Sequence, residues 1–138
     1  MNKIILLSLL ATVLFACANT PKNQTAEITQ QAQKPSVKAI NSTDLPEALL
    51  DENVVLIDVR TPDEVASGYI KGAHKFIDIN GNSFESEIDK LDKSKTYIMY
   101  CRSGGRSGRA AQHMIDNGFS DVFNLTGGIT NYSGELAK

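Results

Sequence analysis

The sequence predicts an α/β fold, in which a mostly parallel central sheet carries helices on both faces. Short apolar segments alternate along the chain with segments whose apolar residues recur at helical spacing. This alternation is typical of parallel strands joined by helices. The segments all lie within residues 37–138, a length that is enough for one modest domain with its own core.

The first half of this domain is expected to contain three strands and two helices. Apolar runs predict the strands at residues 37–40, 54–59 and 76–79. The first helix is expected at residues 45–50, with Asp44 as its cap. The second begins after Thr61, because Thr61 and Glu64 have the spacing of a capping box and a proline occupies the first helical position between them. This second helix is expected to be short.

The second half continues the alternation with two helices and two strands. Asn82 and Glu85 are expected to open the first of these helices as a capping pair. Its apolar face consists of Phe84, Ile88 and Leu91. Strands are predicted at residues 97–100 and 121–125. Between them, an apolar stripe at helical spacing predicts a helix that ends at Gly118. The stripe is formed by Ala110, Ala111, Met114 and Ile115.

Cys101 stands where a buried strand turns through a glycine-bearing loop into a helix, and the loop carries Arg102 and Arg106. Such a loop can aim backbone N–H groups inward, while the helix N-terminus and the arginines add positive charge. We therefore expect the pKa of the Cys101 thiol to lie below the value of roughly 8.5 for a free cysteine. The alternative is a cysteine that only packs in the core. A packing residue has no need of two glycines and two arginines in the next five positions.

Residues 101–107 resemble the active-site loop of the rhodanese family, which consists of single-domain sulfurtransferases with an α/β fold. Two further segments resemble the signatures of that family in order and spacing. The first comprises residues 56–60, Glu64 and residues 68–73, and the second comprises residues 125–129 with Tyr132. The resemblance extends over about residues 37–135, which is nearly all of the predicted domain.

The length of the loop separates two chemistries that share this architecture. Cysteine-dependent phosphatases carry their arginine six positions after the nucleophile, whereas Arg106 stands five positions after Cys101. Tyr100 also replaces the histidine that usually precedes the phosphatase cysteine. In the rhodanese family, a six-residue loop such as residues 101–106 is associated with a pocket for a sulfur atom. The resemblance therefore favours sulfur transfer over phosphate transfer.

The resemblance implies a two-step sulfur transfer that needs no metal and no cofactor. The Cys101 thiolate attacks a small anionic sulfur donor such as thiosulfate and becomes a persulfide. A thiol, cyanide or an acceptor protein then removes the sulfur. The substrate-binding loop is expected to consist of Arg102, Ser103, Gly104, Gly105 and Arg106. Backbone N–H groups of this loop stabilise the sulfur, and the two arginines attract the anionic donor.

The resemblance also implies that Asp58, Arg60 and Glu64 form a structural polar network rather than catalytic machinery. Glu64 has two expected partners. Its spacing predicts the capping box with Thr61, whereas the resemblance suggests a salt bridge with Arg60, and one carboxylate can serve both. His74 and His113 lack metal-ligand spacing. They are interpreted as solvated or capping residues rather than as proton shuttles.

The N-terminus predicts export. One lysine precedes an apolar run of thirteen residues, Ile4 to Ala16, which is too short to span a bilayer and indicates a signal peptide at residues 1–16. The run ends at a sequence similar to a lipoprotein processing site, so Cys17 is expected to carry a lipid anchor in a bacterial cell envelope, with the domain facing the periplasm. Cleavage after Ala18 is the alternative, and it produces a soluble periplasmic protein. Residues 17–36 are polar and predict a flexible tether.

The composition limits the partners. The chain carries 14 basic and 16 acidic side chains, a net charge of −2, and nothing in it suggests nucleic acid. Positive charge at the Cys101 loop points instead to a small anion. With Cys17 lipidated or removed, Cys101 is the last thiol of the exported chain, so no internal disulfide can form. The competing functional class is a non-enzymatic module for sulfur delivery or partner binding.

Overall fold

The computed structural model describes residues 34–138. The predicted signal peptide, the lipidation site Cys17 and the tether up to residue 33 lie outside the described residues and stay predictions. Residues 34–36, the end of the predicted tether, have no regular secondary structure. Among the helices within residues 34–138, none is long and apolar enough to cross a membrane.

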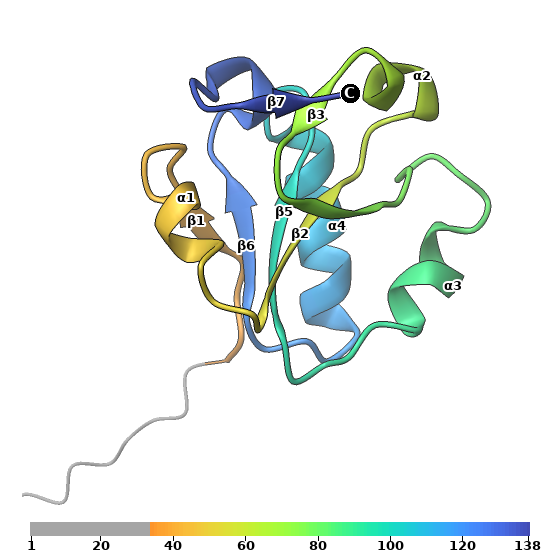
Figure 1. The fold of residues 1–138 in the computed structure, drawn as a ribbon. Helices are drawn as coiled ribbons and strands as arrows, with labels where there is room; N and C mark the ends of the chain where they lie inside the picture. Colours follow the sequence, from red (N-terminus) through yellow and green to blue (C-terminus); the bar gives the residue numbers. More distant parts are fainter. Residues whose placement is uncertain (1–33) are drawn as a thin grey trace, which may run out of the picture. The chain divides into compact units, whose positions relative to one another are not determined.

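A five-stranded parallel sheet forms the centre of the domain (Figure 1). Its strands are β1 (Lys38–Ile40), β2 (Val54–Asp58), β4 (Ala73–Phe76), β5 (Thr96–Tyr100) and β6 (Val122–Leu125). Their order in the sheet is β1-β6-β5-β2-β4, and each neighbouring pair is parallel. Cys101 directly follows β5, the middle strand. The predicted α/β fold with a mostly parallel sheet is confirmed.

Helices cover both faces of this sheet. Successive side chains of β5 point to opposite faces and therefore belong to two different cores. Tyr97, Met99 and Cys101 belong to the core beneath α3 (Phe84–Asp89) and α4 (Gly105–Asp116). Ile98 and Tyr100 belong to the core on the other face, together with Leu45 of α1 (Leu45–Ala48). The short 3₁₀ helix η1 (Gly128–Asn131) adds Ile129 to that second core. Figure 1 shows α1 and α4 on opposite sides of the strands.

Several boundaries differ from the predictions. The expected strand at residues 76–79 is β4, which lies at residues 73–76 and is mostly exposed. The prediction was displaced because Ile77, which lies just after β4, is apolar and buried. The helix expected at residues 45–50 ends at Ala48, and Asp44 makes no capping bond through its side chain. The capping pair expected at the start of α3 is also absent, because that helix begins at Phe84.

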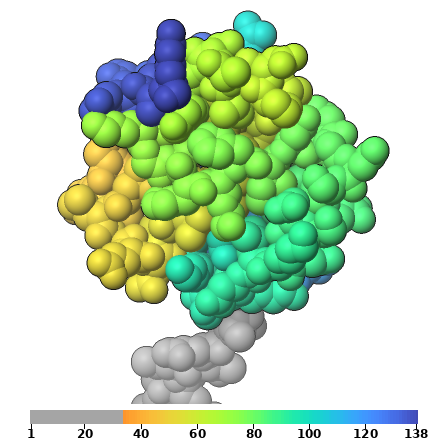
Figure 2. All heavy atoms as spheres, turned by 45° about the vertical axis from the view of Figure 1, so that its right-hand side comes forward, coloured from red at the N-terminus to blue at the C-terminus, as the bar shows by residue number. Residues whose placement is uncertain are grey.

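A small antiparallel pair, which the sequence did not predict, joins the C-terminus to the middle of the chain. It consists of β3 (Tyr69–Ile70) and β7 (Leu136–Ala137). Figure 2 shows the blue C-terminal segment beside the yellow-green segment that contains β3. The backbone N–H of Ile70 donates to the buried hydroxyl of Tyr100 at 3.1 Å. Tyr100 thereby ties this pair to the central strand.

The helix α2 (Pro62–Ala66) is held at its start by the predicted capping box of Thr61 and Glu64. The Glu64 carboxylate also binds both terminal nitrogens of Arg106 on α4, each at 2.6 Å. The hydrogen bond from Arg106 is the main reason that the pKa of Glu64 falls to about 2. One side chain therefore caps α2 and links it to the first turn of α4.

Replacing Tyr100 with phenylalanine should destabilise the domain by about 1–3 kcal/mol, because the N–H of Ile70 would lose its acceptor in a buried site. The measurement is urea unfolding. Tyr97→Phe is the matched control, since its hydroxyl donates to the carbonyl of the exposed Asp92, which water can reach. Equal losses for the two variants would argue against a special role for the Tyr100 hydroxyl.

The Glu64 pair should make stability depend on pH. The pKa of Glu64 is about 2 in the folded protein against an ordinary value of 4.5. The stabilisation is therefore complete above pH 4.5 and disappears as the pH falls towards 2. Because the pair is partly exposed, we expect Glu64→Gln to cost on the order of 1 kcal/mol at neutral pH.

Unfolding of Glu64→Gln and the unchanged protein, compared from neutral pH to pH 2, checks this expectation. The difference in unfolding free energy should shrink across the acid range. Glu87→Gln is the control, because it removes a looser exposed pair with Lys90 at 3.6 Å. A difference that stays constant with pH would show that Glu64 stabilises the fold without its charge.

Candidate active site: the Cys101 loop

The loop that follows β5 encloses the sulfur of Cys101. Cys101 is 1% exposed, and α4 begins only four positions later, at Gly105. Gly104 occupies the N-cap position of α4 with φ of 102°, a left-handed conformation that favours glycine. This turn directs the N–H of Gly104 back to the Cys101 sulfur at 3.1 Å. The glycine is therefore required by the geometry of the loop.

Hydrogen bonds lower the pKa of Cys101. Burial by itself raises the pKa of the thiol. The hydroxyl of Ser107, whose Oγ lies 3.4 Å from the sulfur, and backbone N–H groups around the sulfur outweigh burial, so the pKa lies below its ordinary value. The N–H groups belong to Ser103, Gly104 and Ser107. The site thus favours the thiolate, which is the nucleophilic form of cysteine.

Ser107 and Asn124 are polar residues of the site to which sequence reasoning gave no role. Ser107 is fully buried in the first turn of α4, and its Oγ lies 2.7 Å from Oδ1 of Asn124 on β6. The Asn124 Nδ2 donates to the carbonyl of Gly104 at 3.0 Å. For Ser107, its position in the first helical turn after the cysteine loop was a signal that the sequence contained. Asn124 comes from a distant strand and left no signal in the loop itself.

The two arginines of the loop have different environments. Arg106, which was expected to bind substrate, holds Glu64 through two 2.6 Å hydrogen bonds, and this carboxylate raises the pKa of Arg106. Arg102 is exposed and has no ion-pair partner among residues 34–138. Arg102 is therefore exposed to an incoming anion. Arg106 joins α4 to α2 and also interacts with the Cys101 side chain, and its predicted role in binding substrate stays a prediction.

The expected salt bridge between Arg60 and Glu64 is wrong. Arg60 binds the buried carboxylate of Asp58 instead, with a shortest contact of 2.6 Å. Its guanidinium reaches Glu64 only through the backbone carbonyl, at 3.3 Å, and also donates to the carbonyl of Gly68 at 2.8 Å. Asp58 precedes Arg60 by two positions at the end of β2, so this partner is closer in the chain.

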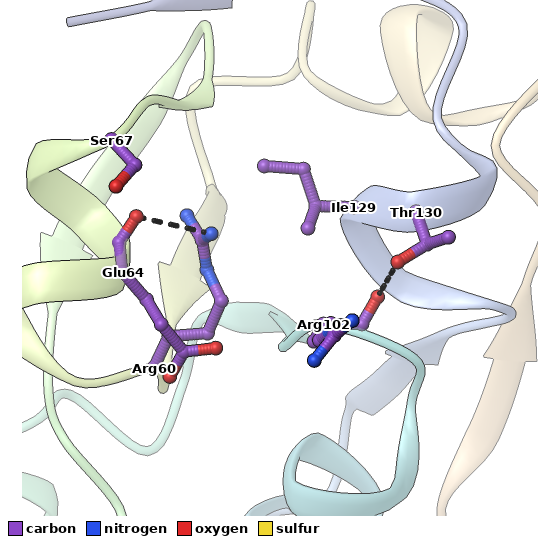
Figure 3. A pocket seen from close by; sticks show the side chains of 6 residues that line it. All are labelled: Arg60, Glu64, Ser67, Arg102, Ile129 and Thr130. Carbon is purple, nitrogen blue, oxygen red and sulfur yellow. Dashed lines mark hydrogen bonds between the residues drawn. The ribbon is translucent and has the colours of Figure 1, made fainter.

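A cavity of about 330 Å³ lies beside the loop. Figure 3 shows Arg60, Glu64 and Ser67 on one side of it and Arg102, Ile129 and Thr130 on the other. Arg102, which directly follows Cys101, brings a cationic side chain to this cavity. The cavity can thus receive a small anion near the Cys101 loop.

The turn at residues 127–128 supports the loop from the other side. The N–H groups of Ile129 and Thr130 donate to the carbonyls of Cys101 and Arg102 at 2.9 and 3.1 Å. Gly128 has φ of 58°, and any side chain there would collide with these two carbonyl oxygens. This close approach explains the glycine at position 128. Tyr132, the expected aromatic residue, packs half-buried against the core on this face.

The remaining predicted residues lie at the rim of the site or away from it. Ser103 and Gly105 are exposed in the loop, and open space surrounds the position that a side chain at Gly105 would occupy. His74 is exposed on β4. The ring of His113 packs against that of Phe84, with 5.4 Å between the two ring centroids. Within residues 34–138, no group of three or more histidine, cysteine or acidic residues is arranged to hold a metal.

Comparisons with known proteins agree with this architecture. The sulfurtransferase of Allochromatium vinosum is 36% identical over 94 residues, which cover 67% of this chain and 85% of that protein. The tRNA sulfurtransferase of Haemophilus influenzae is 37% identical over 76 residues, which cover 54% of this chain and 16% of that protein. The solved structure of a rhodanese-like domain protein from Staphylococcus aureus matches with a TM-score of 0.64 at 31% identity, covering 73% of this chain and 97% of the other.

A family model extends these similarities to most of the chain. The model of the rhodanese-like domain matches residues 41–135. These residues include the Cys101 loop, η1 and every strand of the central sheet except β1. The chain therefore belongs to the rhodanese-like domain family.

Proposed function

We propose that this protein is a sulfurtransferase in which Cys101 carries the transferred sulfur as a persulfide. The observation that carries the proposal is the environment of the sulfur. Its thiolate is favoured by the N–H of Gly104 and the hydroxyl of Ser107, and the next residue in the chain, the exposed Arg102, lines a cavity beside the loop. The sulfurtransferase of Allochromatium vinosum, which is 36% identical, supports the same activity.

Thiosulfate is the proposed donor. The Cys101 thiolate attacks the outer sulfur, the sulfur–sulfur bond of thiosulfate breaks, and sulfite leaves with the bonding electron pair. In the persulfide, the Gly104 N–H still donates to the inner sulfur of Cys101, and the exposed loop backbone at Ser103 and Gly105 is proposed to stabilise charge on the terminal sulfur. Arg102 attracts the dianionic donor and the departing sulfite.

The second step regenerates the thiolate. A cyanide ion or an acceptor thiolate attacks the terminal sulfur of the persulfide, and the Cys101 thiolate leaves. The products are thiocyanate or a new persulfide on the acceptor. The N–H and hydroxyl groups that favour the Cys101 thiolate at the start also make it a better leaving group here.

A sulfur-delivery module is the alternative, and the Haemophilus influenzae protein supports it. There the similar segment is a small part of a larger tRNA sulfurtransferase. In such a role, the persulfide forms but passes only to a protein. The two functions therefore share the first step and differ in the acceptor.

Incubation of the reduced full-length protein with thiosulfate should add about 32 Da, one sulfur atom, to its intact mass. Cys101→Ser should show no gain, and cyanide should remove the gain from the unchanged protein. Cys17→Ser is the matched control, because Cys17 is the other thiol of the chain, and it should behave like the unchanged protein. No gain with thiosulfate or any other donor would overturn the proposed enzyme, whereas a persulfide insensitive to cyanide would favour delivery.

Arg102→Gln should reduce kcat/KM for thiosulfate by roughly tenfold or more, mostly through a higher KM, because the cavity loses its exposed cation. The loss should diminish as salt is added, since screening weakens attraction in the unchanged protein. Arg109→Gln is the control, because Arg109 is an exposed arginine of α4 outside the set that lines the cavity. Similar kinetics for both variants would exclude Arg102 as the anion-attracting residue.

A further inference from the structure

The orientation of the Asn124 amide decides where the Ser107 hydroxyl points. Nδ2 of Asn124 lies 3.0 Å from the carbonyl oxygen of Gly104, so this nitrogen must donate. Turning the amide over would bring two carbonyl oxygens together. The Asn124 oxygen consequently faces Ser107, and the 2.7 Å contact between them is a hydrogen bond donated by the hydroxyl.

Ser107 has one hydroxyl proton but two neighbours that can accept it. Its Oγ lies 2.7 Å from Asn124 Oδ1 and 3.4 Å from the Cys101 sulfur. A protonated thiol needs no donor, and its S–H can itself donate to the Ser107 oxygen. A thiolate gains from every donor beyond the loop N–H groups, so ionisation of Cys101 favours turning the hydroxyl from Asn124 to the sulfur. Asn124 and the Cys101 thiolate therefore compete for the same proton.

The surrounding chain leaves space for this arrangement. Asn124 lies opposite Met99 in the parallel register of β5 and β6, next to the first turns of α4. A side chain at Gly108 would come within 3.2 Å of the Asn124 Nδ2. The glycine at this position of α4 therefore allows the amide to reach both Gly104 and Ser107.

Among the charged groups near the loop, Arg106 interacts with Glu64 and also with the Cys101 side chain, and both partners raise the pKa of Arg106. Arg106 of α4 is paired with Glu64 of α2, and Arg102 of the loop is exposed. Asp58 at the end of β2 is paired with Arg60, which follows that strand. None of these charged groups bonds to the Asn124 amide. Asn124 bonds to two neutral groups instead. Replacing its amide by a neutral side chain consequently alters hydrogen bonding without altering charge.

We propose that Asn124 is a positioning residue for the sulfur chemistry: it holds the hydroxyl of Ser107 away from the sulfur of Cys101 while that sulfur is protonated and releases it to the thiolate. Asn124 does not touch the transferred sulfur in this proposal, and it acts through Ser107. The role builds on the proposed function because Cys101 is the reacting group. Its test needs no sulfur donor, so it can fail or succeed independently of sulfur transfer.

The test is a double-mutant cycle on the pKa of Cys101. The full-length chain with Cys17→Ser has Cys101 as its single thiol, and its thiolate absorbance is titrated against a Cys101→Ser blank. Asn124→Leu removes the competing acceptor, so the pKa should fall. It should fall by roughly half a unit to one unit more when Ser107 is present than in the Ser107→Ala background.

Asn124→Asp supplies the opposite case. It is a second variant that differs from Asn124→Leu in the size and the charge of the new side chain. Like Asn124→Leu, this variant loses the hydrogen bond to the Gly104 carbonyl. Its carboxylate accepts the Ser107 proton more strongly than an amide does, so the pKa of Cys101 should rise. This rise should be larger with Ser107 present than in the Ser107→Ala background, where only the added charge acts. Coupling through Ser107 must therefore have opposite signs for the two Asn124 variants.

The same shift in both backgrounds would overturn the proposal and reduce Asn124 to a support for the Gly104 carbonyl. Coupling of the same sign for Asn124→Leu and Asn124→Asp would overturn it as well. Thermal unfolding of each variant identifies one that does not fold, and the other variant then decides. The mass gain with thiosulfate is measured separately, so loss of persulfide formation with intact coupling would reject the proposed function but not the role of Asn124.

Discussion

A negative sulfur at the end of a buried strand is stable only if polar hydrogens surround it, and much of the domain serves this requirement. Cys101 is 1% exposed, so protein groups must replace water as donors. The left-handed Gly104 directs one N–H to the sulfur, and the first turn of α4 supplies Ser107. These donors lie close to the sulfur because α4 starts directly after the loop. The short loop is thus the feature on which the thiolate depends.

Segments far apart in the chain hold this loop in place. Glu64, which lies 42 positions before Arg106, binds that arginine and ties α4 to α2. From the other side, η1 donates to the carbonyls of Cys101 and Arg102. Because Arg106 is paired and Arg102 is exposed, the two arginines that look alike in the sequence divide their tasks. One contributes to the structure, and the other faces the cavity that a donor would enter.

The sequence predicted the features that depend on local pattern. Alternating apolar segments indicated the parallel sheet, and the spacing of Thr61 and Glu64 indicated a capping box that the structure contains. Residues that pair in a sheet are not always buried, however. The strand β4 is mostly exposed, and its prediction from apolar residues was therefore three residues too late. The strands β3 and β7 have two residues each, which is too few to show an alternating pattern of apolar and polar residues. Partners such as Glu64 with Arg106 or Ser107 with Asn124 depend on tertiary contacts, which no local pattern records.

The position of η1 and β7 near the end of the chain has a consequence for the order of folding. Gly128 must lie against the Cys101 backbone before the loop is supported from that side, and β3 can pair only after Leu136 has been made. On a ribosome, β5 and the cysteine emerge well before these residues, and such long-range contacts form late. The donors at Gly104 and Ser107 follow Cys101 within six positions and are therefore made soon after it. The support from Gly128 and the cavity wall at Ile129 and Thr130 can form only after residues 128–130 have been made.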